Sequence, residues 1–449
     1  MAADRREVLK AIAAGAVAAG AGSQAEAQAR AYRVGVVGCG WFGKLCVNAL
    51  MQIAPVQVVA LCDVDQHMLE EARDQTFARP DSMMRQTRPP AIYRDYRDML
   101  NRHRFDIVIV ATPDHWHTLP AIAAIDKGAH VYLEKPISVD VREGQAIVSA
   151  ARRRNRVVQV GTQRRVAPFT LDAKERVIDA GLLGPVHHVE AFCYFRQRLT
   201  RVSPPSAPPA NLDWDFYCGP AERIDYRAEV HPRNWRSFEP FGNGYMGDVG
   251  VHMIDLARAV LGLGWPRRVW SIGGGLMASD PAITVPDTQV AGFEYDNLLM
   301  TWTNRHWGRA PDPENPWGAA IHGADGTLRL YNTGYEFLPS DRNKARIAAE
   351  LEADGEYAGD TIAPTGDMTL KILTRMNMRD FIGAIREGRR PASDIEEGHI
   401  STATCALANL SLKLGRSLAW DAGAQRIVGD DEANALLARP YRAPWIRPT

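Results

Sequence analysis

The sequence has no excess of charge of either sign. Its 449 residues contain 53 Lys and Arg and 53 Asp and Glu, so the formal net charge is +0. A surface that binds nucleic acid or an anionic membrane normally shows a basic excess. The balance argues against both partners, and we expect no nucleic-acid partner. The chain also has no internal repeat and, after residue 30, no long low-complexity tract.

No apolar run is long enough to predict a membrane-spanning helix. The nearest candidate, 11–22, is short and consists mainly of Ala and Gly. It follows the pair Arg5-Arg6 and precedes a small-residue run at 25–29 that offers A-x-A cleavage sites. This order predicts a twin-arginine signal peptide over 1–29, hence a periplasmic or secreted protein without a stable membrane anchor. The alternative is a disordered basic N-terminus on a cytosolic protein.

Cysteine is scarce, and its spacing shows neither a C-x-x-C pair nor a zinc pattern. The six residues are Cys39, Cys46, Cys62, Cys193, Cys218 and Cys405. An even number in an exported protein can indicate disulfides. Three of them, however, lie on or beside segments that we expect to be buried, where cysteine behaves as a small apolar residue. Because twin-arginine export carries proteins already folded in the reducing cytoplasm, we expect six free thiols.

Strand-like and helix-like segments alternate regularly up to residue 160, and a chain of this length predicts two domains. The expected strands are Arg33–Val37, Val56–Cys62, Phe105–Ala111, His130–Leu133 and Val157–Val160. The expected helices are Lys44–Ile53, Gln66–Gln75, Ala121–Lys127 and Val141–Asn155. Strict alternation predicts right-handed crossovers and a parallel sheet, so 30–160 is expected to be a doubly wound α/β domain of the Rossmann type.

After residue 160 the pattern changes to longer strand-like runs with Pro-rich interruptions. The segments expected here are a helix at Pro168–Ala180, strands at Val186–Phe195, Arg268–Ile272, Gln289–Tyr295, Leu298–Trp302 and Thr327–Leu330, and helices at Met368–Glu387 and Gly398–Leu414. They predict a second α/β domain over 161–449 that has an open, mostly antiparallel sheet. We expect this domain to bind substrate and to mediate oligomerisation.

A glycine-rich turn follows the first expected strand. Gly38 allows a tight turn, Gly40 allows the backbone to approach a pyrophosphate, and Gly43 allows close packing of helix on strand. The following helix presents free N–H groups to the phosphates. Asp63 ends the next strand, where its carboxylate can accept hydrogen bonds from both ribose hydroxyls and repel a 2′-phosphate, so NAD is favoured over NADP. The expected contacts are Gly38, Gly40, Trp41, Phe42, Gly43 and Asp63.

Two further segments follow strands at the same edge of the sheet, where ligands bind in doubly wound folds. The first provides the expected cofactor contacts Thr112, Pro113, Asp114 and His117, and the second provides Glu134 and Lys135. A lysine beside the nicotinamide can hydrogen-bond a reacting hydroxyl and stabilise alkoxide character as hydride leaves. The residue type alone would also fit an ordinary surface lysine.

A third segment carries Asp248, His252 and Asp255 at i, i+4 and i+7, which places them on one face of a helix. A histidine beside a carboxylate is a common general base near neutral pH, because the carboxylate fixes its tautomer and position. The competing interpretation is an N-capping aspartate with a core histidine whose hydrogen bonds are satisfied.

Taken together, these motifs resemble the Gfo/Idh/MocA oxidoreductase family. The resemblance covers nearly the whole mature chain, and it includes the C-terminal segments at 397–399, 420–421, 433–434 and 439–445. It implies that Lys135 polarises the substrate oxygen, that His252 takes the hydroxyl proton, and that Asp248 orients the substrate or the imidazole. Position 114 departs from the family, because it is Asp where Asn is common, and this leaves its role open.

The resemblance implies a polyhydroxylated substrate: a sugar, a cyclitol or a glycoside. Aromatic faces suit pyranose rings, and arginines suit a carboxylate on a uronic acid. The candidate substrate contacts are Trp116, Arg164, Trp235, Arg236 and Tyr245. His115 and His117 could be imagined as metal ligands, but hydride transfer needs no metal and no third ligand is defined, so we expect none here.

Export and cofactor dependence together suggest that NAD is bound during cytoplasmic folding and carried out with the protein. Oxidation could then be a transient step that enables a redox-neutral hydrolysis, elimination or epimerisation, instead of a net dehydrogenation. A non-catalytic sugar- or nucleotide-binding descendant is a third alternative, but the presence of Lys135, Asp248 and His252 together argues against it. The resemblance also implies a homo-oligomer, a dimer or a tetramer.

Overall fold

The structure is a computed structural model that describes residues 31–448 except 196–198, 279, 354 and 358–366. The expected signal peptide at 1–29 lies outside the described residues. Within the described ranges, no helix combines the length and apolar character that a bilayer crossing requires.

The N-terminal unit contains a parallel sheet of six strands within the described residues, in the order β3-β2-β1-β4-β5-β6. Its strands are β1 (Tyr32–Val37), β2 (Val56–Cys62), β3 (Ala91–Tyr93), β4 (Ile107–Val110), β5 (His130–Leu133) and β6 (Val158–Val160). The strand order reverses between β1 and β4, which is where ligands bind in this architecture. β4 is apolar and buried throughout, as a central strand covered on both faces requires.

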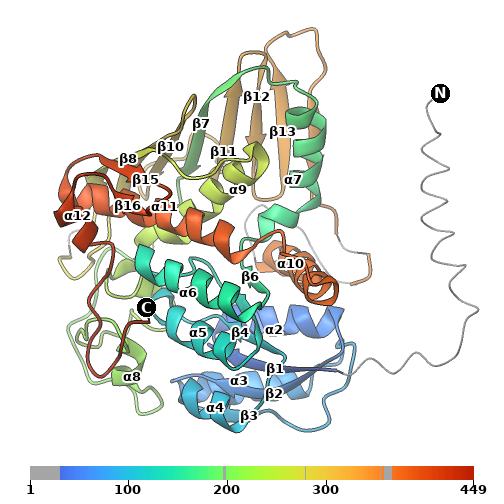
Figure 1. Ribbon diagram of the computed structural model, residues 1–449, viewed down its shortest axis with the longest axis vertical. Coiled ribbons are helices and arrows are strands. Elements are labelled where there is room, and N and C mark those ends of the chain that lie inside the picture. The colour runs from blue at the N-terminus through green and yellow to red at the C-terminus, as the bar shows by residue number, and fades with distance from the viewer. Residues whose placement is uncertain (1–30, 196–198, 279, 354, 358–366, 449) are drawn as a thin grey trace, which may run out of the picture.

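Helices cover both faces of this sheet (Figure 1). They are α2 (Trp41–Ile53), α3 (Gln66–Phe77), α4 (Tyr96–Arg102), α5 (Thr118–Asp126) and α6 (Val141–Arg154). The expected Rossmann domain is confirmed, although several element bounds differ, among them the start of α5, which lies three residues before the expected one. α2 begins three residues earlier than expected, at Trp41. The short pair β3 and α4 was not expected, because a three-residue strand gives almost no sequence pattern.

The second unit is built on a sheet of ten strands in the described part of the chain, in the order β14-β13-β12-β11-β7-β10-β9-β8-β15-β16. Neighbours are antiparallel except for β7 and β10, so the expected open, mostly antiparallel sheet is confirmed. The strands are β7 (Val186–Cys193), β8 (Arg268–Gly274), β9 (Thr288–Glu294), β10 (Leu299–Arg305), β11 (Trp317–Gly323), β12 (Gly326–Leu330), β13 (Gly334–Pro339), β14 (Ile347–Glu350), β15 (Leu418–Asp421) and β16 (Arg426–Ile427).

One face of the large sheet packs against helices, and its core includes Val189 and Ala191 of β7. The helices of this unit are α7 (Pro168–Ala173), α8 (Trp214–Cys218), α9 (Val251–Leu261), α10 (Asp367–Glu387), α11 (Ile395–Leu414) and α12 (Asp431–Ala435). The expected helix at Pro168–Ala180 is α7 continued by the π-helical segment Lys174–Asp179. Figure 1 shows α11 between the large sheet and α6.

Helix α10 returns to the first unit. Its residues Met378, Phe381 and Ile382 belong to the same buried core as α2 and β1. Although α10 lies after the expected domain boundary at residue 160, it packs into the core of the nucleotide-binding unit. The six cysteines, all within the described residues, are buried free thiols, as expected.

Candidate active site

One cavity of about 770 Å³ extends from the switch point of the parallel sheet to the helix-covered side of the large sheet. It is lined by the glycine turn at one end and by Trp317 and Asn332 at the other. Nearly all residues expected from the sequence to contact cofactor or substrate line it. The exceptions are Gly43, His117 and Arg164.

The glycine turn has the geometry that a bound pyrophosphate needs. Gly38 has φ +92°, and a Cβ there would lie 2.5 Å from the carbonyl of Ala111. A Cβ at Gly43 would lie 1.9 Å from the Gly38 oxygen, so this glycine serves helix packing and does not reach the cavity. Gly40 has open space at its Cβ position and caps α2 without a side-chain hydrogen bond. The free N–H groups at the start of α2 therefore fit a dinucleotide phosphate.

Asp63 lies at the end of β2 and lines the cavity. Its two carboxylate oxygens accept hydrogen bonds from the N–H groups of Cys39, at 2.6 Å, and Asp65, at 2.9 Å. The carboxylate thus ties the glycine turn to β2. Each carboxylate oxygen can accept more than one hydrogen bond, so this arrangement leaves acceptor capacity for ribose hydroxyls.

Lys135 and Asp248 come together from the two units. Lys135 Nζ lies 2.8 Å from Asp248 Oδ1 and 2.9 Å from the Asp248 carbonyl oxygen. Arg236 Nε lies 3.0 Å from the same Oδ1. Burial would raise the pKa of Asp248, but the Arg236 and Lys135 cations outweigh it and hold the pKa well below its usual range. Asp248 is therefore an ionised carboxylate that positions two cations at the cavity wall.

His252 lines the cavity one turn beyond Asp248. Its Nδ1 is buried and has no hydrogen-bond partner among the described residues, whereas the Asp248 carboxylate contacts Lys135. Burial, together with the nearby Lys135 and Arg164 cations, lowers the pKa of His252 well below its usual value. The imidazole is consequently neutral at pH 7 and able to accept a proton.

Burial shifts two acids at the strand ends toward their neutral form. Burial raises the pKa of Asp114 to about 8, although Arg236 and Lys135 partly oppose the shift. Burial likewise raises the pKa of Glu134 to about 7. A protonated Asp114 has one O–H donor beside one acceptor oxygen, so in this form it can both donate and accept, as an asparagine side chain can. This explains how Asp can occupy a position where Asn is common.

The histidines after β4 are structural. Both ring nitrogens of His115 face carbonyl oxygens, Nε2 at 2.8 Å from Tyr217. His117 Nδ1 lies 2.6 Å from the Pro136 oxygen, and its Nε2 lies 2.9 Å from the Thr112 oxygen. His117 therefore lies between the two strand-end segments and does not line the cavity, so its expected contact with the cofactor stays a prediction. Neither histidine offers a ring nitrogen to the cavity.

The aromatic residues expected to contact a sugar are largely covered by other side chains. Trp116 stacks on Phe216 at 5.3 Å, and the edge of Trp445 packs against it at 4.8 Å. The Arg236 guanidinium lies 4.1 Å from the ring centroid of Trp235. Both tryptophans line the cavity but are only 5% exposed, so they support its wall and do not present open faces. Tyr245 is half-buried at the cavity beside His306.

Arg164 is buried and does not line the cavity, so its expected contact with substrate stays a prediction. Its guanidinium lies 4.4 Å from the ring centroid of Trp317 and donates a hydrogen bond to Asn332. The edge of Trp317 in turn faces His252, with ring centroids 6.3 Å apart. Arg164 thus contacts the same indole ring as His252 and acts on the imidazole through its charge.

Sequence reasoning missed the cavity residues contributed by loops and by the large sheet. These are chiefly Gln163, Phe195, His231, Arg233, Trp317 and Asn332. No local motif marks them, because only the packing of the large sheet against the Rossmann unit brings them to the cavity. The ion pair of Arg236 with Asp248 has no sequence signal either.

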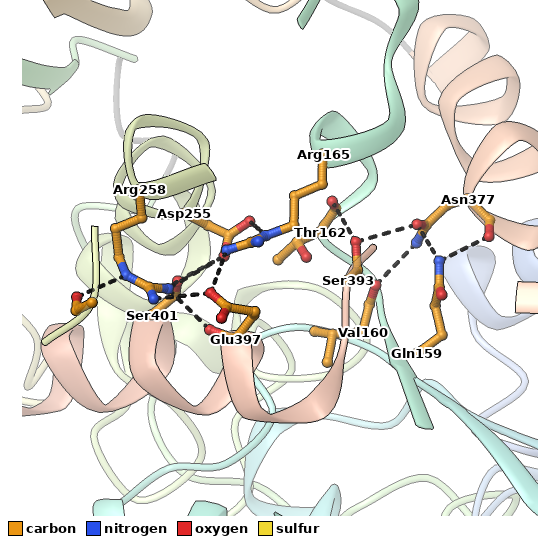
Figure 2. Close-up of polar contacts among 11 residues, drawn as sticks. Gln159, Val160, Thr162, Arg165, Asp255, Arg258, Asn377, Ser393, Glu397 and Ser401 are labelled. Atoms are coloured by element: carbon orange, nitrogen blue, oxygen red, sulfur yellow. Dashed lines mark hydrogen bonds and ion pairs between the residues drawn. The ribbon is translucent and has the colours of Figure 1, made fainter. Parts of the chain in front are cut away.

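A buried network beside the cavity holds α9, the helix that carries His252 (Figure 2). Arg165 makes two hydrogen bonds to Asp255, and Ser401 of α11 donates to the same carboxylate at 2.7 Å. Arg258 and Arg165 both bind Glu397 Oε2, at 3.0 and 3.1 Å. Two arginines and two carboxylates therefore connect α9 to α11 and to the segment that carries Arg165.

A second group in Figure 2 ties α10 to β6. Asn377 Nδ2 donates to the Val160 carbonyl at 3.0 Å, and Gln159 Nε2 donates to the Asn377 carbonyl at 2.8 Å. Ser393 Oγ donates to the Thr162 carbonyl at 3.2 Å. These contacts fix the segment between β6 and Arg165, and so connect the nucleotide-binding unit to the network at α9.

Among curated sequences, the chain resembles glycoside-cleaving proteins over part of its length. It is 36% identical over 126 residues to a glycosyl hydrolase family 109 protein of Shewanella baltica, covering 27% of this chain and 26% of that protein. It is 34% identical over 126 residues to an alpha-N-acetylgalactosaminidase of Shewanella oneidensis, with the same coverage. The match thus spans about a quarter of the length of these relatives.

Solved structures share the fold over most of the chain. An oxidoreductase of Agrobacterium radiobacter in complex with NAD+, L-tartaric acid and magnesium has a TM-score of 0.66 at 15% identity, covering 87% of this chain and 98% of that one. A levoglucosan dehydrogenase in complex with NADH and levoglucosan has a TM-score of 0.64 at 19% identity, covering 87% and 99%. Myo-inositol 2-dehydrogenase of Lactobacillus plantarum has a TM-score of 0.61 at 18% identity, covering 87% and 99%.

Family models match both units. The model described as the oxidoreductase family with NAD-binding Rossmann fold matches residues 32–162. The model described as the C-terminal alpha/beta domain of the same oxidoreductase family matches residues 210–419. The chain therefore belongs to the Gfo/Idh/MocA oxidoreductase family.

Proposed function

We propose that the protein oxidises a hydroxyl group of a sugar, cyclitol or glycoside, with NAD bound along the Gly38–Gly43 turn. One observation carries the proposal: the turn, Lys135 and His252 line the same cavity. When bound, NAD accepts hydride from the carbon that bears the hydroxyl. The substrate loses that hydride and the hydroxyl proton, and becomes a ketone.

Lys135 and His252 have different roles toward the reacting oxygen. Lys135 is held by Asp248 in the cavity wall, where its ammonium stabilises negative charge that develops on this oxygen. His252 is neutral and accepts the hydroxyl proton. Because Asp248 pairs with both Lys135 and Arg236, its negative charge also offsets the repulsion between the two cations.

Carbohydrate chemistry is the best match among substrates for this cavity. Its volume of about 770 Å³ accommodates the nicotinamide end of a dinucleotide and a small ring. Its wall carries both hydrogen-bond donors and apolar surface. Two of the structural neighbours are named for levoglucosan and myo-inositol, which are both compact polyhydroxylated rings. Asp63 favours NAD over NADP, because its carboxylate would repel a 2′-phosphate.

The test is turnover on a panel of aldoses, cyclitols and glycosides, following the absorbance of reduced cofactor and the products together. Wild type should reduce NAD with at least one of these compounds. Lys135→Met should lose activity by about 10²–10⁴-fold while still binding NAD. Lys127→Met is the matched control, because Lys127 is exposed and bonds Asn101 on the surface. Equal activity of the Lys135 variant and wild type would contradict the proposal.

A second candidate is a redox-neutral reaction at the same site, in which transient oxidation enables glycoside cleavage, elimination or epimerisation. The partial identity to glycosyl hydrolase family 109 proteins favours it. A ketone makes the neighbouring C–H acidic, and His252 is placed to remove that proton. In the same panel, product formation without net accumulation of reduced cofactor identifies this alternative.

We further propose that residues 1–29 direct twin-arginine export with NAD already bound. Dinucleotide is scarce outside the cytoplasm, so a protein that works there needs to retain its cofactor. Protein purified without added cofactor should release NAD when it is heated. A heat extract without NAD would contradict this part of the proposal and leave the hydride-transfer site itself untouched.

A further inference from the structure

The open face of the large sheet carries a group of metal-ligating side chains away from the active-site cavity. His188 and Glu190 lie on β7, and His322 lies on the adjacent strand β11 (Figure 1). One ligand atom of each residue lies within 4.8 Å of those of the other two. None of the three residues lines the cavity. We refer to them as the His188 cluster.

The sheet register brings these side chains together. His188 and His322 are direct partners across the antiparallel pair β7–β11, and their rings stack with centroids 5.6 Å apart. Glu190 lies two residues after His188, so both side chains project from the same face. The partner of Glu190 on β11 is Ala320, whose small side chain leaves room for the carboxylate to reach diagonally toward His322.

The closest contact in the His188 cluster joins His322 to Glu190, and the tautomer of His322 decides how this contact is made. His322 Nε2 lies 3.0 Å from Glu190 Oε2, and His322 Nδ1 lies 3.1 Å from the Thr327 hydroxyl oxygen. When Nδ1 donates to Thr327, the Nε2 lone pair faces the carboxylate. In that tautomer a proton or a metal ion lies between them, whereas in the other tautomer the Nε2–H group donates to Glu190 directly. The second nitrogen of a metal-bound histidine is commonly fixed in this way by an outer hydrogen-bond partner.

The His188 cluster faces solvent. The side chains of His322 and Glu190 are 35% and 53% exposed, so an ion can enter without opening the core. The neighbouring β7 residues Val189 and Ala191 project to the opposite face and belong to the buried core. A metal ion can therefore bind on the open face without changing the packing of the core on the other face of the sheet.

We propose that His188, Glu190 and His322 bind one zinc ion, with water as the fourth ligand. Two imidazoles and one carboxylate form a three-residue ligand set that is typical of zinc sites with an open position. Nitrogen ligands favour zinc over magnesium or calcium, which prefer all-oxygen sites. With both histidines neutral, the ligand set carries one negative charge, which favours a divalent cation. The ion would cross-link β7 to β11.

The experiment uses the full-length protein without an affinity tag, stripped with EDTA and dialysed, and titrated with ZnCl₂ by calorimetry. CoCl₂ then serves as a spectroscopic probe of coordination. Wild type should bind one equivalent of zinc and should give a visible cobalt spectrum with nitrogen and oxygen ligation. His322→Ala and His188→Ala should each weaken zinc binding by about tenfold or more. Circular dichroism establishes that both variants fold.

His187→Ala is the matched control. His187 is the neighbouring histidine on the same strand, but its ring nitrogen bonds the carbonyl of Asn297 and it is not part of the His188 cluster. This variant should bind zinc as wild type does. Glu190→Gln keeps the size of the side chain and removes its charge, and it should also weaken binding.

Two results would overturn the proposal. One is wild-type protein that binds no zinc, in which case the His188 cluster is a histidine–glutamate hydrogen bond only. The other is a folded His322→Ala variant with wild-type affinity, which would place the zinc elsewhere. Because neither readout involves hydride transfer, the outcome is independent of the proposed active-site function.

Discussion

Arg165 and Asp255 form a two-point ion pair, with Nε–Oδ2 and Nη2–Oδ1 distances of 2.8 and 2.9 Å. Both side chains are almost fully buried. Arg165 follows the last strand of the Rossmann sheet, whereas Asp255 lies on α9 one turn after His252. The pair therefore fixes the helix that carries the proposed base relative to the unit that holds the dinucleotide. Figure 2 shows that Ser401 of α11 completes the contact.

Asp255→Ala should destabilise the protein by about 3–5 kcal/mol, because it leaves Arg165 buried with only part of its negative partner. The measurement is denaturant-induced unfolding. Asp126→Ala is the control: Asp126 pairs with Arg154 at 2.9 Å, but about half of each side chain is exposed. Removing that pair should cost no more than about 1 kcal/mol. Equal losses in the two variants would show that burial does not set the strength of the Asp255 contact.

Asp114 should make stability decrease with rising pH. Burial raises its pKa to about 8, so between pH 4 and 8 the unfolded chain has released a proton that the folded protein retains. The contribution of Asp114 to the free energy of unfolding is fully present below pH 4. Above that pH it decreases by about 1.4 kcal/mol per pH unit until the pH reaches the pKa of the folded state. Asp114→Asn has no such proton. The stability of wild type relative to this variant should therefore fall by up to about 4 kcal/mol between pH 5 and 8.

Unfolding curves of both proteins at four pH values measure this difference. Glu134 and Glu143, whose pKa values burial raises to about 7, affect both proteins alike and cancel in the comparison. A difference that stays constant from pH 5 to 8 would mean that Asp114 is ionised throughout. It would then not mimic asparagine.

The sequence predicted the parts of the site that depend on local order. The Gly38 turn, the Lys135 segment and the continuous helical segment 246–261 that carries Asp248 and His252 are each marked by a local pattern. Local pattern is enough to place such residues, because backbone geometry alone sets where they point. That a parallel sheet is followed along the chain by a mostly antiparallel sheet was predictable for the same reason.

The partners of those residues were not predictable. Arg236 binds Asp248, and Trp317 contacts both Arg164 and His252, only because the large sheet packs against the Rossmann unit. His117 was expected at the cofactor, but its two ring nitrogens face carbonyl oxygens from separate strand ends. Helix α10 was assigned to the second unit by its position in the chain, whereas its apolar face packs on α2. These contacts depend on long-range packing that no spacing in the sequence records.

Arg164 should tune the pH dependence of the proposed reaction without touching substrate. Burial and the Lys135 and Arg164 cations together lower the pKa of His252. Wild type should therefore keep its hydride-transfer rate as the pH falls from 7 to 6, where an ordinary histidine begins to protonate. Arg164→Met removes one cation, so the pKa of His252 should rise and the acidic limb of the rate profile should move to higher pH.

The pH profile of single-turnover cofactor reduction measures this shift, since it reports the pKa and not only the rate. Arg176→Met is a suitable control, because Arg176 is a half-exposed residue paired with Asp172 away from the cavity. Its profile should match wild type. A lower rate in the Arg164 variant with an unmoved acidic limb would reduce Arg164 to a packing role.

Asp63 should set both the affinity for NAD and the discrimination against NADP. Its carboxylate holds the Cys39 N–H at 2.6 Å and lines the cavity where the ribose is expected. Asp63→Ser removes a charged acceptor, which is worth about 1.5–3 kcal/mol, so the Kd for NAD should rise by roughly 10- to 100-fold. The same change removes the repulsion of a 2′-phosphate, so the ratio of NADP to NAD affinity should increase.

Quenching of tryptophan fluorescence during titration with each dinucleotide measures both affinities, because Trp41 and Trp235 line the cavity. Asp74→Ser is the control, since Asp74 is an exposed residue of α3 paired only with its neighbour Arg73 among the contacts of its side chain in the described chain. If Asp63→Ser weakened NAD and NADP by the same factor, Asp63 would act only by fixing the glycine turn. A selective gain for NADP would instead place its charge at the ribose.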